Sequence, residues 1–316
     1  MFTYRSLMLL ILVILAIGCQ ADSTEVVEVP VTVEVTRVVE ATRLVEVAPA
    51  PPEPEVVEVT RVVEPPPESV QLETPAVNPM MPIEFETISS SVTGRDYAIT
   101  IALPASYLFT EASYPVIYVT DGDFYAIPLA MAAAQLAFVQ ELPEFIVVGV
   151  DYGIPDPMAW LELRELDMGP EGRASYLRFF QEELIPYIEG TYRANSANRA
   201  LAGHSAGADF ALYGLLNGAD TFNNFIASSP GGAADMIDAV AALAAGETPT
   251  RLFLSVGDQD LEPVVAGVDA FDQALTNVGA AGSSHLTMIL DGETHLSARP
   301  RAFSSGLRWV YATEGE

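Results

Sequence analysis

The stretch LAGHSAGADF, residues 201–210, places Ser205 between Gly203 and Gly207 at the end of an apolar run. The residues before it have the composition of a short buried strand, and GADFALYGLL after it has helical spacing. Ser205 is therefore predicted at a strand-to-helix turn, the context that makes Gly-x-Ser-x-Gly a nucleophile elbow. Both glycines are expected to be needed, because such a turn brings strand and helix too close together for side chains at these positions.

A serine at this turn has a favourable electrostatic environment. It precedes a helix, whose N-terminal dipole favours developing negative charge. The backbone N–H of Ala206 is the candidate for one half of an oxyanion hole. Serine alone is a poor nucleophile, so the hypothesis also requires a general base and a carboxylate that orients it.

Three histidines are available as the base. His295 lies in DGETHLSARP, just after the strand-like HLTMIL and before a predicted helix, which is where the base of such a site should be. His204 adjoins Ser205, but on a sharp turn its side chain is expected to point elsewhere and to pack beneath the elbow. His285 opens the strand-like run and is expected to be structural. The sequence therefore favours His295.

The carboxylate is expected between the serine and the histidine in chain order. The predicted strand RLFLSVG ends at Gly257, and the DQDLE that follows offers Asp258, Asp260 and Glu262. Asp258 directly follows the glycine and is expected to serve the turn, whereas Asp260 lies deeper in the loop. We select Asp260 and keep Asp258 and Glu262 as alternatives.

A second oxyanion donor should come from the loop after an early strand. YPVIYVTDGDFY, residues 114–125, supplies Asp121, Gly122 and Asp123 after an apolar run. The backbone N–H of Asp123 is the candidate, provided that its carboxylate points away from the oxyanion. A plain Asp-Gly turn is the alternative.

Strand-like and helix-like segments alternate through residues 81–316, which predicts one α/β domain with a mostly parallel sheet covered by helices on both faces. Sites in such sheets form at the carboxyl ends of the strands. The predicted strands are residues 97–104, 114–120, 145–152, 198–205, 222–230, 251–257 and 285–292. The predicted helices are residues 176–192, 207–216, 233–245, 264–278 and 301–313.

The chain begins with a different kind of sequence. Residues 1–18 are expected to be a signal peptide, because Arg5 precedes an apolar run too short to span a bilayer. Gly-Cys at the end of that run resembles the lipobox of bacterial lipoproteins, which implies lipidation of Cys19 and an extracytoplasmic protein held at the membrane. Ordinary secretion and an uncleaved anchor are the alternatives.

The Val/Glu/Pro-rich residues 19–80 contain VEVTRVVE twice. They are interpreted as the lipidated N-terminus and an extended, low-complexity tether. A partner-binding β-repeat is the other interpretation.

The chain carries 43 acids against 14 bases, all of them arginine, for a net charge of −29. This balance excludes a typical nucleic-acid-binding protein, which needs clustered Lys and Arg, and it is interpreted as a solvated acidic surface. A single cysteine rules out an internal disulfide. The sequence has no Cys/His cluster with metal spacing and no P-loop, so no metal and no organic cofactor are expected.

The domain resembles the bacterial putative-esterase family of α/β-hydrolases, a group related to esterase D, feruloyl and acetyl-xylan esterases and enterochelin-type siderophore esterases. The resemblance rests on six segments in family order, which are YPVIYVTDGD, FIVVGVDYG, FFQEELIPYIEGTYR, NRALAGHSAGADFALYGLL, LFLSVGDQD and DGETH. It covers roughly residues 83–313. It implies an α/β-hydrolase fold with Ser205 as nucleophile, Asp260 as acid and His295 as base.

Further residues match family loops that line the site. GVDYG and LRELDMGP make Tyr152, Arg164 and Asp167 substrate-side candidates. The structural alternative is that Arg164 and Asp167, at positions i and i+3, pair with each other on a helix.

Two departures from the family pattern stand out. Ala208 replaces a second glycine after the elbow, and SSPGGAAD, residues 228–235, lacks the aromatic residues of many relatives. The second departure argues against bulky aryl or siderophore substrates. The implied reaction is hydrolysis of a small-molecule or glycan-linked carboxylic ester through an acyl-enzyme. An acyltransferase of the same fold and a catalytically silent surface binding module are the alternatives.

Overall fold

The strands pair in the order β1-β2-β4-β3-β5-β6-β7-β8 to form one mixed sheet. The computed structural model describes residues 81–245, 248–279 and 283–311, and all of them belong to one compact unit. The first two strands pair antiparallel with their neighbours, and the rest are parallel. The strands are β1 (Ile83–Ser89), β2 (Asp96–Ala102), β3 (Tyr114–Thr120), β4 (Ile146–Asp151), β5 (Ala194–His204), β6 (Asn224–Ser228), β7 (Arg251–Gly257) and β8 (Ser284–Leu290).

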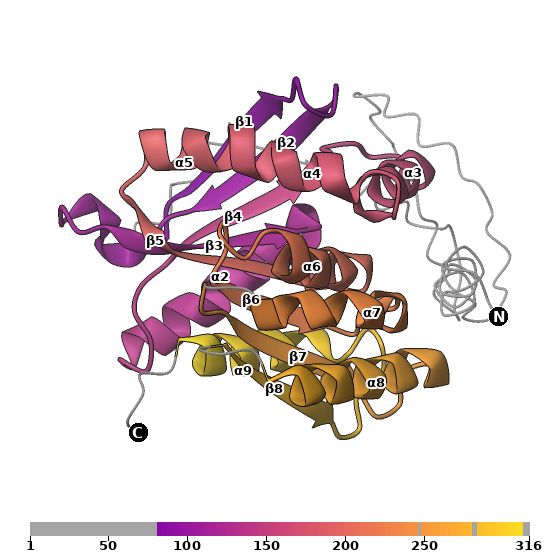
Figure 1. Cartoon of the computed structure of the whole chain (residues 1–316). Helices are drawn as coiled ribbons and strands as arrows, with labels where there is room; N and C mark the ends of the chain where they lie inside the picture. Colours follow the sequence, from indigo (N-terminus) through magenta and orange to yellow (C-terminus); the bar gives the residue numbers. More distant parts are fainter. Residues whose placement is uncertain (1–80, 246–247, 280–282, 312–316) are drawn as a thin grey trace, which may run out of the picture. The chain divides into compact units, whose positions relative to one another are not determined.

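Helices cover both faces of this sheet (Figure 1). One face carries α4 (Arg173–Phe179), the π-helical turn η2 (Phe180–Leu184), α5 (Ile185–Thr191), α6 (Ala206–Asn217), α7 (Ile237–Val240) and α8 (Glu262–Val278). The other face carries α2 (Gly122–Phe138) and α9 (Arg299–Val310). The remaining helical segments are η1 (Ala105–Leu108), α3 (Pro157–Met168), η3 (Ala233–Met236) and η4 (Ala241–Ala245).

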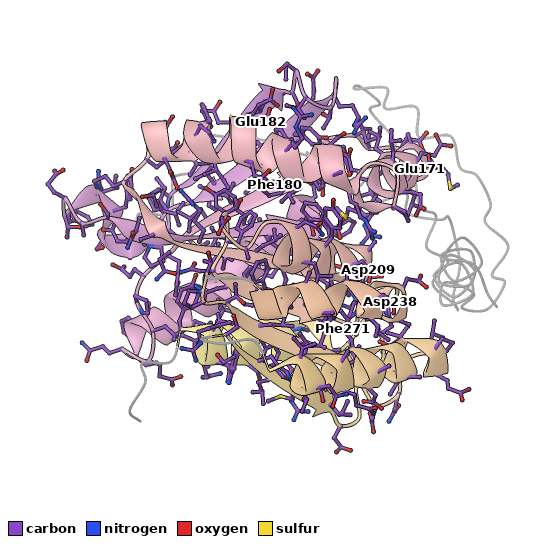
Figure 2. All side chains as sticks on the ribbon, in the orientation of Figure 1. Glu171, Phe180, Glu182, Asp209, Asp238 and Phe271 are labelled. Atoms are coloured by element: carbon purple, nitrogen blue, oxygen red, sulfur yellow. The ribbon has the colours of Figure 1, made fainter. Side chains whose placement is uncertain are left out.

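The core follows from the composition of the central strands. Every residue of β3 is buried, as expected for a strand covered on both faces. Phe180 in η2 and Phe271 in α8 are fully buried on the face that α4–α8 cover (Figure 2). Because β3 and β5 are parallel neighbours, the turns that follow them meet at the same edge of the sheet.

The predicted α/β-hydrolase architecture and its mostly parallel sheet are confirmed. Each predicted strand overlaps an observed one, and the helix predicted over 176–192 is a continuous helical segment from Arg173 to Thr191. Four elements were not predicted, namely β1, η1, α2 and α3. The strand β1 is a mostly exposed edge strand, and α2 is apolar all round, so this helix lacks the polar side of an amphipathic helix.

The predicted signal peptide, lipidated Cys19 and tether lie outside the described residues. Within the described ranges, no helix combines the length and the hydropathy that a bilayer crossing requires.

Candidate active site

Ser205 lies where β5 ends and α6 begins, as predicted. Its backbone has φ 58° and ψ −123°, in a region that side-chain-bearing residues rarely adopt, so the turn stores strain on the order of 1–3 kcal/mol. The Ser205 N–H donates to the Ser228 carbonyl (2.9 Å), which fixes the turn to the end of β6. Ala206 opens α6, and its N–H belongs to the first helical turn, whose amides have no acceptor within the helix.

The two glycines around the serine are in such close contact with neighbouring atoms that a side chain would not fit at either position. A Cβ at Gly203 would lie 2.1 Å from the Gly207 carbonyl oxygen, and one at Gly207 would lie 2.2 Å from Thr120 Oγ1. Neither position has room for a methyl group. The close approach of strand and helix that the sequence predicts is observed at Gly203, whereas Gly207 is confined by Thr120 at the end of β3.

The structure brings His295 and Asp260 together. His295 Nδ1 lies 3.0 Å from both carboxylate oxygens of Asp260, whose side chain is fully buried. The Leu261 N–H donates to Asp260 Oδ1 (2.7 Å) and so fixes the carboxylate. This arrangement places a proton on Nδ1 and leaves the lone pair of Nε2 free to accept one. His295 Nε2 is buried and has no hydrogen-bond partner within the described structure.

The other residues considered as acid or base do not take part in the contact between Asp260 and His295. Asp258 and Glu262 are exposed, and neither hydrogen-bonds to His295 in the described ranges. His285 lies in β8, where its Nε2 is 3.2 Å from Asp272 Oδ1. The geometry singles out Asp260 and His295.

His204 is buried beside His295, in addition to packing beneath the elbow. Its ring centroid lies 4.8 Å from that of His295, its Nδ1 lies 3.2 Å from Ser228 Oγ, and Tyr125 packs edge-on against it. Burial, together with the nearby His295, Arg299 and Arg164, holds the pKa of His204 well below its usual value. A neutral His204 adds no positive charge next to His295.

The backbone N–H expected to be the second oxyanion donor is already hydrogen-bonded. The Asp123 N–H donates to Asp151 Oδ2 at 3.1 Å and is therefore occupied in this structure. Asp151 Oδ1 in turn accepts from the Tyr152 N–H (2.7 Å) and from Trp160 Nε1 (2.6 Å). Burial raises the pKa of the Asp151 carboxyl, although these donors and the Asp123 N–H oppose the shift. The Asp123 side chain is exposed, as the expectation required.

Arg164 ties together the two turns that form the site. Its Nε and Nη2 donate to the two carboxylate oxygens of Asp121 (2.7 and 2.8 Å), and Nη2 also lies 3.3 Å from the His204 carbonyl oxygen. Asp121 follows β3 and adopts the left-handed conformation (φ 55°, ψ 49°), whereas Ser205 shares only its positive φ. Both charged side chains are more than nine-tenths buried. The pair therefore locks the turn after β3 to the turn after β5.

Removing that lock is expected to cost about 3–5 kcal/mol of unfolding free energy, because Arg164→Met leaves Asp121 buried without its bidentate partner. Urea denaturation of the full chain measures the loss. Arg178→Met, which breaks an exposed pair with Glu182, is the matched control and should leave the midpoint unchanged. Asp121→Asn combined with Arg164→Met should recover part of the stability, since the unpaired charge is gone. Equal losses of unfolding free energy in Arg164→Met and Arg178→Met would contradict a structural role for the buried pair.

The other two substrate-side candidates are buried in the fold. Asp167 pairs with Arg95 and accepts from the Tyr97 hydroxyl (2.9 Å), and its side chain is fully buried. The Tyr152 hydroxyl donates to the Leu163 carbonyl (3.2 Å). The alternative of a helical pair between Arg164 and Asp167 is wrong, because each side chain reaches a different strand-end partner across the fold.

Asp209 lies in the first turn of α6 (Figure 2) and was not among the candidate site residues predicted from the sequence. Its Oδ1 accepts the Gly232 N–H at 2.7 Å, and a Cβ at Gly232 would lie 3.3 Å from that carboxylate, which is a tight contact. Asp209 thus fixes the loop after β6 against the helix that carries the elbow. In the sequence, only its position one helical turn after Ser205 could have indicated that Asp209 lies near the site.

In the part of the chain that the structure describes, no group of three or more His, Cys, Asp or Glu side chains is arranged to hold a metal ion.

The chain is similar to known esterases in sequence and in fold. The family model described as "Putative esterase" matches residues 90–262. Ferri-bacillibactin esterase BesA of Bacillus subtilis is 29% identical over 167 residues, which cover 46% of this chain and 57% of that protein. The siderophore triacetylfusarinine C esterase of Aspergillus fumigatus is 25% identical over 151 residues, covering 43% of this chain and 52% of that protein. The alignments thus span between half and three fifths of these two curated relatives.

A solved structure extends the likeness over most of the domain. The BES protein from Bacillus cereus superposes with a TM-score of 0.68 at 26% identity, covering 78% of this chain and 100% of that one.

Proposed function

Since the chain belongs to the Putative esterase family, we propose that it is a serine esterase with Ser205 as nucleophile, His295 as general base and Asp260 as the acid that orients the base. The observation that carries the proposal is the His295 ring, held on Nδ1 by a buried carboxylate while Nε2 is left without a partner. In structures without substrate the bond between nucleophile and base is often long, and it forms as the site closes on its ester.

The proposed reaction has two halves. His295 Nε2 takes the Ser205 proton while the serine oxygen attacks the ester carbonyl. The alcohol then leaves with that proton, and an acyl-serine remains. A water molecule, deprotonated by the same nitrogen, attacks the acyl carbon; the bond to the serine oxygen breaks, that oxygen takes the proton back from Nε2, and the carboxylic acid is released.

The oxyanion is proposed to bind first to the Ala206 N–H, at the positive end of α6. The Asp123 N–H serves as second donor once the Asp151 carboxylate releases it. The released carboxylate remains linked to Tyr152 and Trp160 through its other oxygen.

The substrate is proposed to be a small-molecule or glycan-linked ester. The two curated relatives are named for siderophore substrates. In this chain the loop after β6 has no aromatic residue between Ser228 and Asp235, so one wall for a bulky aryl group is missing. We therefore favour esters with a small acyl group.

Hydrolysis of p-nitrophenyl esters by the full chain tests the function. We expect turnover of the acetate ester, with a decline as the acyl chain lengthens. Mass spectrometry of the products, with and without acceptor sugars, separates hydrolysis from acyl transfer. Absence of turnover on every ester and acceptor would contradict the proposal and favour a binding module.

We further propose that Cys19 is lipidated and that residues 19–80 tether the domain of residues 81–316 outside the cytoplasm. The support is the apolar run that ends in Gly-Cys after Arg5, followed by the Val/Glu/Pro-rich segment. Metabolic labelling with palmitate should mark the wild-type chain and not Cys19→Ser. A label retained by the variant would contradict the assignment.

A further inference from the structure

His204 is a buried titratable side chain that the proposed triad does not use. The residue is 1% exposed, and its Nε2 has no hydrogen-bond partner among the described residues. Its ring lies 4.8 Å, centroid to centroid, from the ring of His295 and is tilted by 52° against it. A histidine in contact with the proposed base is therefore available for a role beyond filling space beneath the elbow.

His204 is unsuited to be the base itself. A general base of this kind needs a carboxylate that fixes its tautomer and stabilises the imidazolium. The Nδ1 of His204 faces the neutral hydroxyl of Ser228 at 3.2 Å, and no carboxylate bonds to its ring within the described ranges. Burial, together with His295, Arg299 and Arg164, also holds the pKa of His204 well below its usual value. The His204 ring is therefore neutral and a poor proton acceptor.

The hydrogen bond to Asp260 leaves one motion of the His295 ring open. His295 Nδ1 lies 3.0 Å from both oxygens of Asp260, so the ring is anchored at one nitrogen and can tilt about it. Nε2 has no hydrogen-bond partner in the described structure, and the residues that follow, Leu296 and Ser297, are exposed. The direction of Nε2 thus depends on what packs against the ring. A displacement of about 1 Å at a reacting group can cost on the order of 100-fold in rate.

His204 is held firmly enough to set that direction. It is the last residue of β5, and its backbone lies in parallel register with Ser228 of β6. Its carbonyl oxygen accepts from Arg164 Nη2 at 3.3 Å. Its ring is fixed at Nδ1 by the Ser228 hydroxyl and on another side by Tyr125, whose ring packs edge-on at 6.1 Å. His204 therefore has less freedom to move than the loop residue that it contacts.

Tyr125 is supported in turn by α9. Tyr125 belongs to α2, and its hydroxyl accepts from Arg299 Nη1 at 3.2 Å. Phe303, one turn further along α9, packs against the Tyr125 ring at 5.7 Å. The loop that carries His295 leads directly into α9, so the helix that ends this loop also supports the ring next to His204. The contacts therefore run from Arg299 through Tyr125 and His204 to His295.

We propose that His204 is a positioning residue, whose ring sets the direction in which His295 Nε2 points and so determines its approach to the Ser205 hydroxyl. The inference rests on the proposed function, because it takes His295 as the base. What His204 supplies is a flat, neutral ring, so a phenyl ring at this position should serve as well as the imidazole. A flexible aliphatic side chain of similar size should not, because His295 could then tilt away from the serine.

The rate at which a fluorophosphonate labels Ser205 in the full chain, followed by intact-protein mass spectrometry, tests the proposal. This rate depends on how readily His295 takes the serine proton, whereas the final labelled fraction counts the correctly folded sites. Every chain carries Ser228→Ala, so that no variant leaves the buried Ser228 hydroxyl unpaired. In this background His204→Leu should slow labelling about 10–100-fold with the final fraction unchanged. His204→Phe should label within a few-fold of the Ser228→Ala parent.

Kinetics with p-nitrophenyl acetate should give the matching result. The kcat of His204→Leu is expected to fall by a similar factor while KM stays within a few-fold, because positioning of the base acts on the chemical step. Circular dichroism checks that the variants fold.

A second pair of variants keeps the test decisive if His204→Leu does not fold. Tyr125→Leu removes the ring that supports His204 and should slow labelling several-fold, whereas Tyr125→Phe keeps that ring and should not.

The outcomes that would overturn the proposal are distinct. Labelling of His204→Leu at the parent rate would mean that the ring contact is dispensable. Equal slowing in His204→Leu and His204→Phe would assign the effect to the ring nitrogens. A lower final fraction at an unchanged rate would make His204 a purely structural residue. A wild-type chain that neither labels nor turns over esters would contradict the proposed function itself, and this inference would fall with it.

Discussion

Ser205→Ala is expected to lower kcat for p-nitrophenyl acetate by about 10⁵–10⁶-fold, because a triad works as a unit and loses nearly all of its chemistry with the nucleophile. The alanine fits at the elbow, and the variant should fold as the wild type does. The hydroxyl is lost from a turn whose strained backbone holds Ser205 at the positive end of α6, where the residue is only 9% exposed. Steady-state kinetics on the full chain measure the loss.

Ser255→Ala is the matched control for this substitution. Ser255 is fully buried in β7, and its hydroxyl has no hydrogen-bond partner in the described structure. Its removal should leave kcat within a few-fold of the wild type. A Ser205→Ala chain that keeps its activity would mean that a different residue attacks the ester.

Asp260→Asn is expected to lower kcat by about 10⁴-fold while leaving the fold intact. The reason lies in the Leu261 N–H, which donates to one oxygen of this side chain. In the asparagine variant the amide oxygen keeps that bond, so its NH₂ group faces His295 Nδ1. The imidazole must then accept at Nδ1 and carry its proton on Nε2, which is the wrong tautomer for taking the serine proton.

The control for this prediction is Asp258→Asn. Asp258 lies two residues away, is exposed, and makes no bond to His295 in the described residues. Measurements of kcat over a pH range separate the two variants. Asp260→Asn should lower kcat at every pH where the His295 imidazole is neutral, because its imidazole is in the wrong tautomer, whereas Asp258→Asn should not. A larger loss of kcat in Asp258→Asn than in Asp260→Asn would mean that Asp258, and not Asp260, orients His295.

Local features of the site could be predicted from the sequence. The elbow depends on a few consecutive residues, so the glycines, the serine and the flanking strand and helix were sufficient to place Ser205. His295 could be selected because only three histidines exist and only one follows a strand near the C-terminus. These predictions require no knowledge of how distant segments pack.

Contacts between distant segments could not be predicted in the same way. Asp121 and Arg164 are 43 residues apart, and the nearer Asp167 suggested a helical pair that does not form. The capture of the Asp123 N–H by Asp151 likewise depends on how β3 and β4 end side by side. Asp260 was favoured by its place in the loop, but only the fold distinguishes it from Asp258 through contact with the base.

Helix α2 was missed for a related reason. Its residues are apolar on the buried and the exposed side, and Pro128 lies within it. A surface helix is predicted from apolar residues that recur on one side and polar residues on the other, and α2 lacks this contrast.

The nucleophilic role of Ser205 is tested by labelling of the full chain with a fluorophosphonate, followed by mass spectrometry of the digested protein. A fluorophosphonate reacts only with a serine that a neighbouring base activates, so the label reports the working nucleophile rather than an exposed hydroxyl. We expect one adduct, on Ser205, formed in step with loss of esterase activity and absent from Ser205→Ala. An unlabelled chain, or a label on another residue while Ser205 stays unmodified, would contradict it.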